Sequence, residues 1–308
     1  MFFEGSEKKL EIIIDEDAVN LLEIKDSFWT DVVKSCRAEI ISTISNKYLK
    51  AFLLSESSLF VWKDRIVMIT CGQTILANSV EYLISELGRD VVDSLIFQRK
   101  NEYDSRLQKS SFLDDVARFQ HHFPGKAFRL GYLDGHHNYI YHSNGALESS
   151  KDDNTAELLM YHITGDVRDI LLTPNQSKEV IRDLIKPESL FKGFQIDDFI
   201  FEPFGYSLNA INARDYATIH ISPQEGTSYI SFETNMNSEK TRELLPKIID
   251  IFSPRSFDYI GFNHDEGIRF NDNFNNISTF RDIISGYDVN FEHHICTTDG
   301  PRKAIPLI

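Results

Sequence analysis

Apolar and polar positions alternate along the chain in a way that predicts short strands separated by helices. Residues 10–14 (LEIII) form a mainly apolar segment of strand length, and a buried strand is predicted there. Two further apolar runs, 52–54 and 59–62, flank the polar segment 55–58, and a short polar turn then leads into a fourth run at 66–70. Apolar runs separated by short polar turns are typical of β-hairpins.

Helical spacing of apolar residues predicts three helices in the first half of the chain. Between residues 17 and 45, apolar side chains recur at intervals of three and four, so a helix should cover much of this stretch. A second helix should run from about Gln73 to Gly88, a typical C-terminal cap. A third should span about 112–123, because Pro124 and Gly125 follow it.

The second half of the chain repeats this alternation. Strands are predicted at 199–201, 217–221 and 228–233, followed by a helix with Ser238 as its N-cap. The interval 144–154 is the most polar and is predicted to be a loop. Strands punctuated by helices, without a regular βαβ period, favour an α+β fold. We expect a layered αββα sandwich with two mainly antiparallel sheets between outer helices.

Length and composition fit one globular domain covering residues 1–308. No apolar run approaches the roughly 20 residues that span a bilayer, and the N-terminus lacks the basic region of a secretory signal. The three cysteines, Cys36, Cys71 and Cys296, are too few and too scattered for a disulfide framework or a zinc site. The cytoplasm is therefore the expected location.

The formal net charge of −15 makes the chain acidic. Such a surface repels nucleic acid and anionic membranes and attracts cations, so we expect neither nucleic acid nor a membrane as a partner. The plainer interpretation is that the acidity gives solubility, and it becomes informative only if the substrate is a cation.

Four segments, in order, carry the signal for chemistry. The segment 54–60 reads LSESSLF and is followed at 70–72 by TCG. Taken alone, a serine pair between two apolar strands is a turn. Together with 3–8 (FEGSEK), 201–209 (FEPFGYSLN) and 218–235, however, it resembles the eukaryotic-type, pyruvoyl-dependent S-adenosylmethionine decarboxylase family. The resemblance extends from about residue 3 to 263 and is weakest between 102 and 150.

This resemblance implies self-cleavage between Glu56 and Ser57. In the family, the serine hydroxyl attacks the preceding carbonyl, and elimination of the resulting ester leaves a pyruvoyl group on residue 57. The chain would be cut into a small chain, 1–56, and a large chain, 57–308. The pyruvoyl group, derived from Ser57, would be the covalent cofactor that accepts electrons when carbon dioxide leaves the substrate.

The resemblance also assigns three catalytic roles. His220 would be the base for the elimination, assisted by Ser207, and a histidine suits that role because its pKa lies near neutrality. Cys71 would return a proton to the substrate carbon, since a thiol with a pKa of about 8.5 is protonated at neutral pH. The alternatives are a hydrogen-bonded core histidine and a small buried cysteine.

Contacts to S-adenosylmethionine are implied in the same way. Phe3 and Phe201 would sandwich the adenine, and Glu4 and Glu7 would favour the positive sulfonium. Gln224 stands where the family usually has a ribose-binding glutamate, so it can bind a diol only without charge assistance. The residues that the resemblance places beside the substrate are Phe3, Glu4, Glu7, Leu54, Phe201 and Gln224.

An acidic cluster resembles the putrescine site of some family members. Its residues are Glu11, Asp153, Glu157 and Glu233. We expect putrescine to bind there but to activate only modestly, because Ile69 stands where relatives carry a coupling lysine or arginine. The alternative is four surface acids in a chain that contains 47.

The expected function is decarboxylation of S-adenosylmethionine to the aminopropyl donor for spermidine and spermine synthesis, with a homodimer of cleaved protomers as one assembly. The alternative is a catalytically weak or dead paralogue that acts as the regulatory subunit of a true decarboxylase. Retention of Ser57, Cys71, Ser207 and His220 favours the enzyme, whereas Gln224 favours the paralogue. A domain that merely binds a metabolite, and stays uncut, is a weaker alternative.

Overall fold

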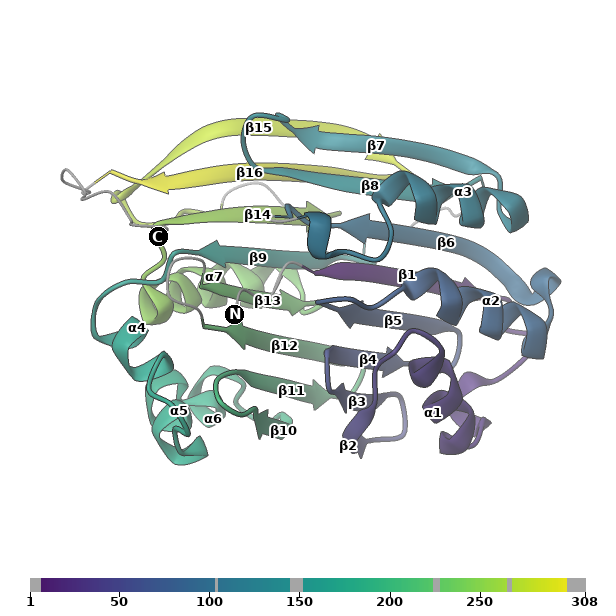
Figure 1. The fold of residues 1–308 in the computed structure, drawn as a ribbon, viewed down its shortest axis with the longest axis horizontal. Coiled ribbons are helices and arrows are strands. Elements are labelled where there is room, and N and C mark those ends of the chain that lie inside the picture. The colour runs from purple at the N-terminus through teal and green to yellow at the C-terminus, as the bar shows by residue number, and fades with distance from the viewer. Residues whose placement is uncertain (1–6, 103–104, 145–151, 224–227, 265–267, 298–308) are drawn as a thin grey trace.

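The computed structural model of the chain describes residues 7–102, 105–144, 152–223, 228–264 and 268–297 (Figure 1). Its two eight-stranded sheets are antiparallel at every strand pair described. Helices α1–α3 lie on the side of one sheet and α4–α7 on the side of the other (Figure 1). The predicted αββα sandwich is confirmed.

The first sheet has the strand order β2-β3-β4-β5-β1-β6-β8-β7. Its outer face packs against α1–α3 through a cluster that includes Leu10, Trp29 and Phe97, all fully buried. The elements are β1 (Lys8–Ile14), α1 (Asp26–Ser35), β2 (Ile40–Ser45), β3 (Lys50–Leu54), β4 (Ser57–Val61), β5 (Arg65–Thr70), α2 (Leu76–Leu87), β6 (Val92–Arg99), α3 (Phe112–His122), β7 (Gly125–Gly131) and β8 (His137–Ser143). Short 3₁₀ helices are formed by Leu21–Glu23, Arg89–Val91 and Ser105–Leu107.

The second sheet has the order β10-β11-β12-β13-β9-β14-β16-β15, which is the first order with every number raised by eight. Its outer face packs against the longest helix, α7, through a cluster that includes Ile219, Leu245 and Phe252. The elements are β9 (Thr155–Tyr161), α4 (Gly165–Leu171), α5 (Lys178–Ile185), α6 (Pro187–Leu190), β10 (Gln195–Ile200), β11 (Tyr206–Asn212), β12 (Asp215–Ser222), β13 (Tyr229–Thr234), α7 (Ser238–Phe252), β14 (Ser256–Phe262), β15 (Phe274–Ile284) and β16 (Tyr287–Cys296).

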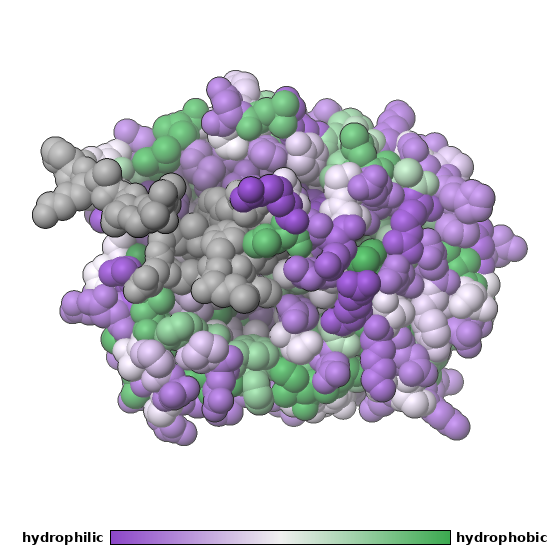
Figure 2. Space-filling model, viewed as in Figure 1, coloured by the Kyte–Doolittle hydropathy of each residue, from purple (hydrophilic) through white to green (hydrophobic). Residues whose placement is uncertain are grey.

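The inner faces of the two sheets meet in a layer that combines apolar and charged residues. At one end, Ile140 packs in a cluster with Ile260, and at the other, Phe60 packs with Tyr216. The chain also buries many polar groups, and the candidate site is built from some of them. On the face seen in Figure 2, hydrophilic side chains predominate over α1–α3, and apolar ones occur in small separate groups. Among the described helices, none combines the length and apolarity needed to cross a bilayer.

Two local predictions were wrong. The predicted helix between 17 and 45 is limited to Asp26–Ser35, and Ile40–Ser45 is an edge strand instead. The helix ends because Arg37 adopts a positive φ of 74°, which reverses the chain into β2. The N-cap of α7 is Asn237 rather than Ser238, since the Asn237 side chain accepts a hydrogen bond from the Lys240 backbone N–H at 3.0 Å.

The hairpins around residues 52–70, the helix that ends at Gly88 and the helix at 112–122 are confirmed. Residues 145–151 of the predicted polar loop lie outside the described residues.

Candidate active site

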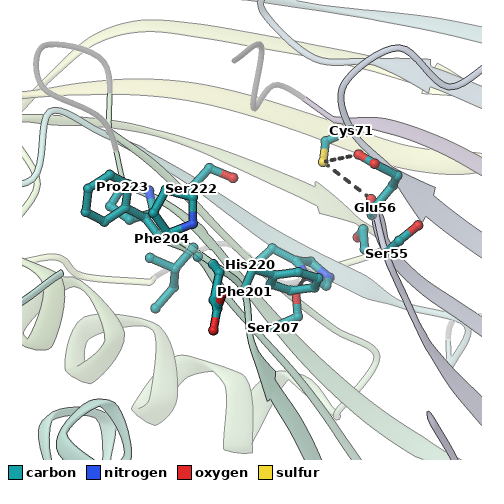
Figure 3. A pocket seen from close by; sticks show the side chains of 14 residues that line it. Ser55, Glu56, Cys71, Phe201, Phe204, Ser207, His220, Ser222 and Pro223 are labelled. Carbon is teal, nitrogen blue, oxygen red and sulfur yellow. Dashed lines mark hydrogen bonds between the residues drawn. The ribbon is translucent and has the colours of Figure 1, made fainter. Parts of the chain in front are cut away.

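A cavity of about 450 Å³ lies where the hairpin β3–β4 of the first sheet faces β11 and β12 of the second. Figure 3 shows Glu56 and Cys71 on one side of this cavity and Phe201, Ser207 and His220 on the other. Its lining includes six predicted residues: Glu56, Ser57, Cys71, Phe201, Ser207 and His220. The fold therefore gathers residues that lie up to about 160 positions apart in the chain.

Ser57 begins β4 in a strained conformation. Leu54 pairs with Ser57 across the hairpin, so Ser55 and Glu56 form a two-residue turn between the strands. The φ of Ser57 is 136°, a region that non-glycine residues rarely adopt and that costs on the order of 1–3 kcal/mol. Its hydroxyl is buried and has no hydrogen-bond partner among the described residues. Buried polar groups are normally paired, so this unpartnered hydroxyl needs a functional explanation.

Cys71 contacts the peptide that precedes Ser57. Its backbone N–H donates to the Glu56 carbonyl oxygen at 3.0 Å, and its thiol lies 3.4 Å from the same oxygen. Burial, and then the nearby charges of Glu56 and Glu7, hold the pKa of the Cys71 thiol well above its usual range. The thiol is therefore protonated at neutral pH.

His220 lies on the inner face of β12, directly opposite Ser207 of β11. Its Nδ1 lies 2.8 Å from the Ser207 hydroxyl, and its Nε2 lies 2.9 Å from the Thr218 hydroxyl and 3.3 Å from that of Ser58. Burial lowers the pKa of His220 to about 3, below the near-neutral value expected from the sequence. The imidazole is therefore neutral at pH 7 and keeps a lone pair, although burial makes it a weaker base.

Three residues beside His220 were not predicted: Ser58, Asn209 and Thr218. The Ser58 and Thr218 hydroxyls donate to the Asn209 side-chain oxygen at 2.6 and 3.0 Å. A signal was present in the sequence, because polar residues alternate with apolar ones along β11 and β12 and alternate residues share one face of a strand. That alternation predicts which residues of β11 and β12 lie on the inner face. It does not predict the contact with Ser58, which belongs to the opposite sheet.

The N-terminal strand places two ionisable groups near Cys71. Glu7 is buried and accepts a hydrogen bond from the Ser231 hydroxyl, and burial raises the pKa of Glu7 to about 7. Lys8, which was not predicted, donates to the Gly72 carbonyl at 2.7 Å and so holds the turn that follows Cys71.

The predicted substrate contacts have different outcomes. Phe201 lines the cavity and packs edge-to-face on Phe199, with 4.9 Å between ring centroids. The Leu54 side chain belongs to the core under α1–α3, so a substrate contact at this position would involve its backbone. The remaining predicted positions, Phe3, Glu4 and Gln224, lie outside the described residues.

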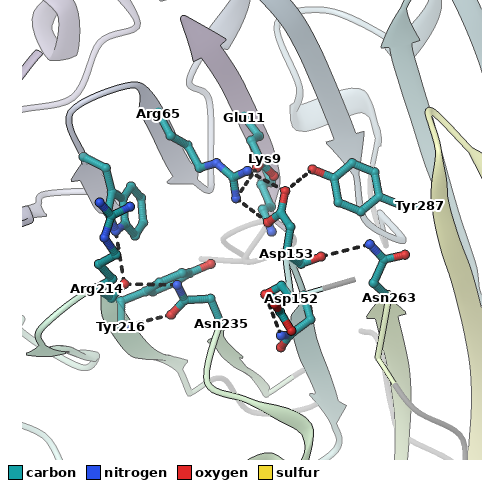
Figure 4. A network of polar contacts seen from close by, with 12 residues as sticks. Lys9, Glu11, Arg65, Asp152, Asp153, Arg214, Tyr216, Asn235, Asn263 and Tyr287 are labelled. Atoms are coloured by element: carbon teal, nitrogen blue, oxygen red, sulfur yellow. Dashed lines mark hydrogen bonds and ion pairs between the residues drawn. The ribbon is translucent and has the colours of Figure 1, made fainter. Parts of the chain in front are cut away.

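The four acids of the predicted putrescine site come together in the layer between the sheets, where three cations of the chain already contact them. Figure 4 shows part of this cluster, with Glu11 and Asp153 beside Arg65. The Lys9 ammonium lies 3.0 Å from Glu157 and 2.7 Å from Glu233, all three being almost fully buried. Lys100 also contacts Glu157. The other two acids, Glu11 and Asp153, are both paired with Arg65. These acids are not an exposed surface group, and they already have counter-charges.

Comparisons with known proteins agree with this geometry. Residues 1–298 match the sequence profile of the family described as adenosylmethionine decarboxylase. The S-adenosylmethionine decarboxylase proenzyme of Leishmania donovani is 33% identical over 278 residues, which cover 84% of this chain and 73% of the relative. The proenzyme of Xenopus laevis is 34% identical over 284 residues, covering 83% of this chain and 82% of the relative.

A solved structure has the same fold. The crystal structure of a Trypanosoma brucei AdoMetDC-delta26 monomer matches with a TM-score of 0.62 and 23% sequence identity, covering 78% of this chain and 99% of the other. The profile match and the two proenzymes show that the chain belongs to the adenosylmethionine decarboxylase family.

Proposed function

We propose that this chain decarboxylates S-adenosylmethionine to the aminopropyl donor for spermidine and spermine synthesis, using a pyruvoyl group that it makes from Ser57. One observation carries the proposal. Ser57 has a strained backbone and a buried, unpartnered hydroxyl, and it lines the same cavity as Cys71, Ser207 and His220. A serine that only shaped a turn would need none of these features.

Processing begins with the peptide between Glu56 and Ser57. The Ser57 Oγ attacks the Glu56 carbonyl carbon, the C–N bond breaks, and an ester replaces the amide. The Cys71 N–H already donates to the carbonyl oxygen, so it can stabilise the negative charge that develops there. Breaking the peptide also releases the strained φ of Ser57, which favours the ester.

His220 is the proposed base for the second step. Removal of the Ser57 Cα proton expels the carboxylate of residue 56 and leaves a dehydroalanine, which takes up water and loses ammonia to become the pyruvoyl group. Ser207 holds the ring through Nδ1, and the opposite nitrogen reaches the hydroxyl of Ser58, the neighbour of the reacting residue. The neutral ring keeps a lone pair for this task.

The cavity residues fit a pyruvoyl group at position 57. When formed, that group supplies an electron sink for decarboxylation. Cys71, which keeps its proton because its pKa is raised, lies in the same cavity and can deliver that proton to the substrate carbon. Phe201 offers an apolar wall for the adenine and a ring face for the sulfonium.

The two products of cleavage should stay together. The fragment 1–56 contains β1, which pairs with β5 and β6, and β3, which pairs with β4. Release of this fragment would remove β1 from the centre of the first sheet and leave β5 and β6 without their partner strand. A homodimer of cleaved protomers is also proposed, and light scattering after gel filtration tests it.

Putrescine regulation is proposed to be weak. A diamine would have to share the acidic cluster with Lys9, Lys100 and Arg65, which already satisfy its charges. The Lys9 ammonium takes the position that one end of a diamine would need, so decarboxylation should depend little on added putrescine.

Intact-mass measurement on the denatured protein tests the main proposal. The wild type should give two fragments that meet between Glu56 and Ser57, with the N-terminus of the large one blocked as a pyruvoyl group. Ser57→Ala should stay uncut, whereas Ser55→Ala, a change in the same turn, should still be cut. A wild type that stays intact would refute self-cleavage. A cut protein without decarboxylase activity would favour the regulatory-subunit alternative instead.

A further inference from the structure

A second cluster of reactive side chains shares no residue with the lining of the cavity. His136 precedes β8 in the turn between β7 and β8 of the first sheet, while Asp258 and His293 lie opposite one another on β14 and β16 of the second. The Asp258 carboxylate is 3.1 Å from the His136 Nδ1 and 2.6 Å from the His293 Nδ1. One ligand atom from each of the three side chains lies within 4.8 Å of the other two.

The buried negative charge of Asp258 needs a nearby positive charge to balance it. Its carboxylate is fully buried, and its described hydrogen bonds come from His136, His293 and the Tyr161 hydroxyl, none of which carries a permanent charge. Lys100 is within electrostatic range, but its ammonium is bonded to Glu157. A buried carboxylate without a charged partner is costly, so either the histidines take up protons or a metal ion supplies the charge.

The arrangement of the two rings favours the metal ion. The imidazoles of His136 and His293 are stacked, with 4.1 Å between their centroids and 26° between their planes. Two protonated rings at this separation would repel each other, whereas a metal ion supplies the positive charge to two neutral rings once they turn their Nδ1 lone pairs from the carboxylate to the ion.

The donor set is one that transition metals use. Two imidazole nitrogens and one carboxylate oxygen, with a fourth position left for water, are typical of zinc sites and of related divalent metals. Bond lengths of about 2.0–2.2 Å in a tetrahedron separate ligand atoms by roughly 3.3 Å, so small side-chain rotations would admit the ion. The Tyr161 hydroxyl, which donates to Asp258 at 2.9 Å, would fix the carboxylate from behind.

We propose that His136, Asp258 and His293 bind one divalent transition metal ion, with Zn²⁺ as the representative, and that this ion fastens the β7–β8 turn of the first sheet to the inner face of the second. The partly exposed side chain of His136 gives the ion a route from solvent. The neighbouring strands β7 and β16 already touch, so the ion would reinforce an existing contact.

Zinc titration of the chelator-stripped, tag-free full chain tests the proposal by calorimetry and by thermal unfolding. One equivalent should bind with a rise in Tm, and His136→Ala should weaken binding at least tenfold. His137→Ala, the neighbouring histidine, is the matched control and should bind as the wild type does. Cys71→Ala should also retain the site, which separates it from any zinc held by the thiol.

Cobalt provides a second measurement, because Co²⁺ bound by these ligands would show visible ligand-field bands that His136→Ala removes. His136 is on a turn and partly exposed, so His136→Ala should fold. It is therefore the preferred test over a change at Asp258, which is buried and whose replacement by Asn could prevent folding. No zinc binding by the wild type, or equal affinity in His136→Ala and His137→Ala, would overturn the proposal and leave a hydrogen-bonded cluster.

Discussion

Replacing Lys9 by Ala tests whether the chain supplies its own counter-charge to the acidic cluster. The Lys9 ammonium bridges Glu157 and Glu233, and its side chain is 2% exposed. Removing one partner of a buried ion pair costs about 3–5 kcal/mol, because the remaining charge stays buried and unpaired. An unfolding entropy of about 2.1 cal/mol/K per residue gives about 650 cal/mol/K for 308 residues, so Tm should fall by about 5–8 °C.

Thermal unfolding by calorimetry measures this loss, and Lys63→Ala is the control. Lys63 faces Glu16 at 3.7 Å in an exposed pair, so its loss should shift Tm by less than about 2 °C. Putrescine should stabilise Lys9→Ala, by about 2.7 kcal/mol or 4 °C at a hundredfold excess over its Kd, and should stabilise the wild type much less. An unchanged Tm in Lys9→Ala, or equal putrescine responses in the two proteins, would refute the reasoning.

Three further predictions concern processing and turnover. Cys71→Ala should still be cut but should lose about 10²–10⁴-fold in kcat, the usual contribution of a positioned proton donor; wild-type turnover would exclude this role. His220→Ala should stop at the ester, so hydroxylamine should cut it between Glu56 and Ser57 while untreated protein stays at full length; spontaneous pyruvoyl formation would contradict the assignment. Because the pKa of Glu7 is raised to about 7, its carboxylate is charged above that pH and should attract the cationic substrate. KM should therefore fall as pH rises through 7 in the wild type, but not in Glu7→Gln.

The hairpins and their order along the chain could be predicted because their signals are local. Alternating apolar runs and polar turns determine the β3–β4–β5 hairpins, and Gly88 ends α2 as expected. The edge strand β2 was misread because Ile40 and Ile44 also fit one face of a helix. The strand alternates half-buried and exposed residues, so it lacks the continuous apolar run that identified its neighbours.

The charge pairing between the sheets could not be predicted from local signals. Lys9 and Glu157 are separated by 148 positions, and only the stacking of the two sheets brings them together. The resemblance identified the acids as a cluster. The sequence around Lys9 does not distinguish a buried lysine from an exposed one, because the acids that pair with it come from the opposite sheet. The pairing of Lys100 with Glu157 is hidden for the same reason.

The identical strand order of the two sheets suggests that an ancestral gene for one layered half was duplicated and fused. The two halves have different tasks in the proposed mechanism. The first sheet carries the bond proposed to be cut and the thiol, at Ser57 and Cys71, while the second carries the proposed base and its hydroxyl partner, at His220 and Ser207. β4 and β12 hold equivalent places in their sheets, yet the proposed nucleophile begins one and the proposed base lies on the other. Neither half could then process itself alone, so the activity belongs to the fusion and each half is under selection to keep facing the other.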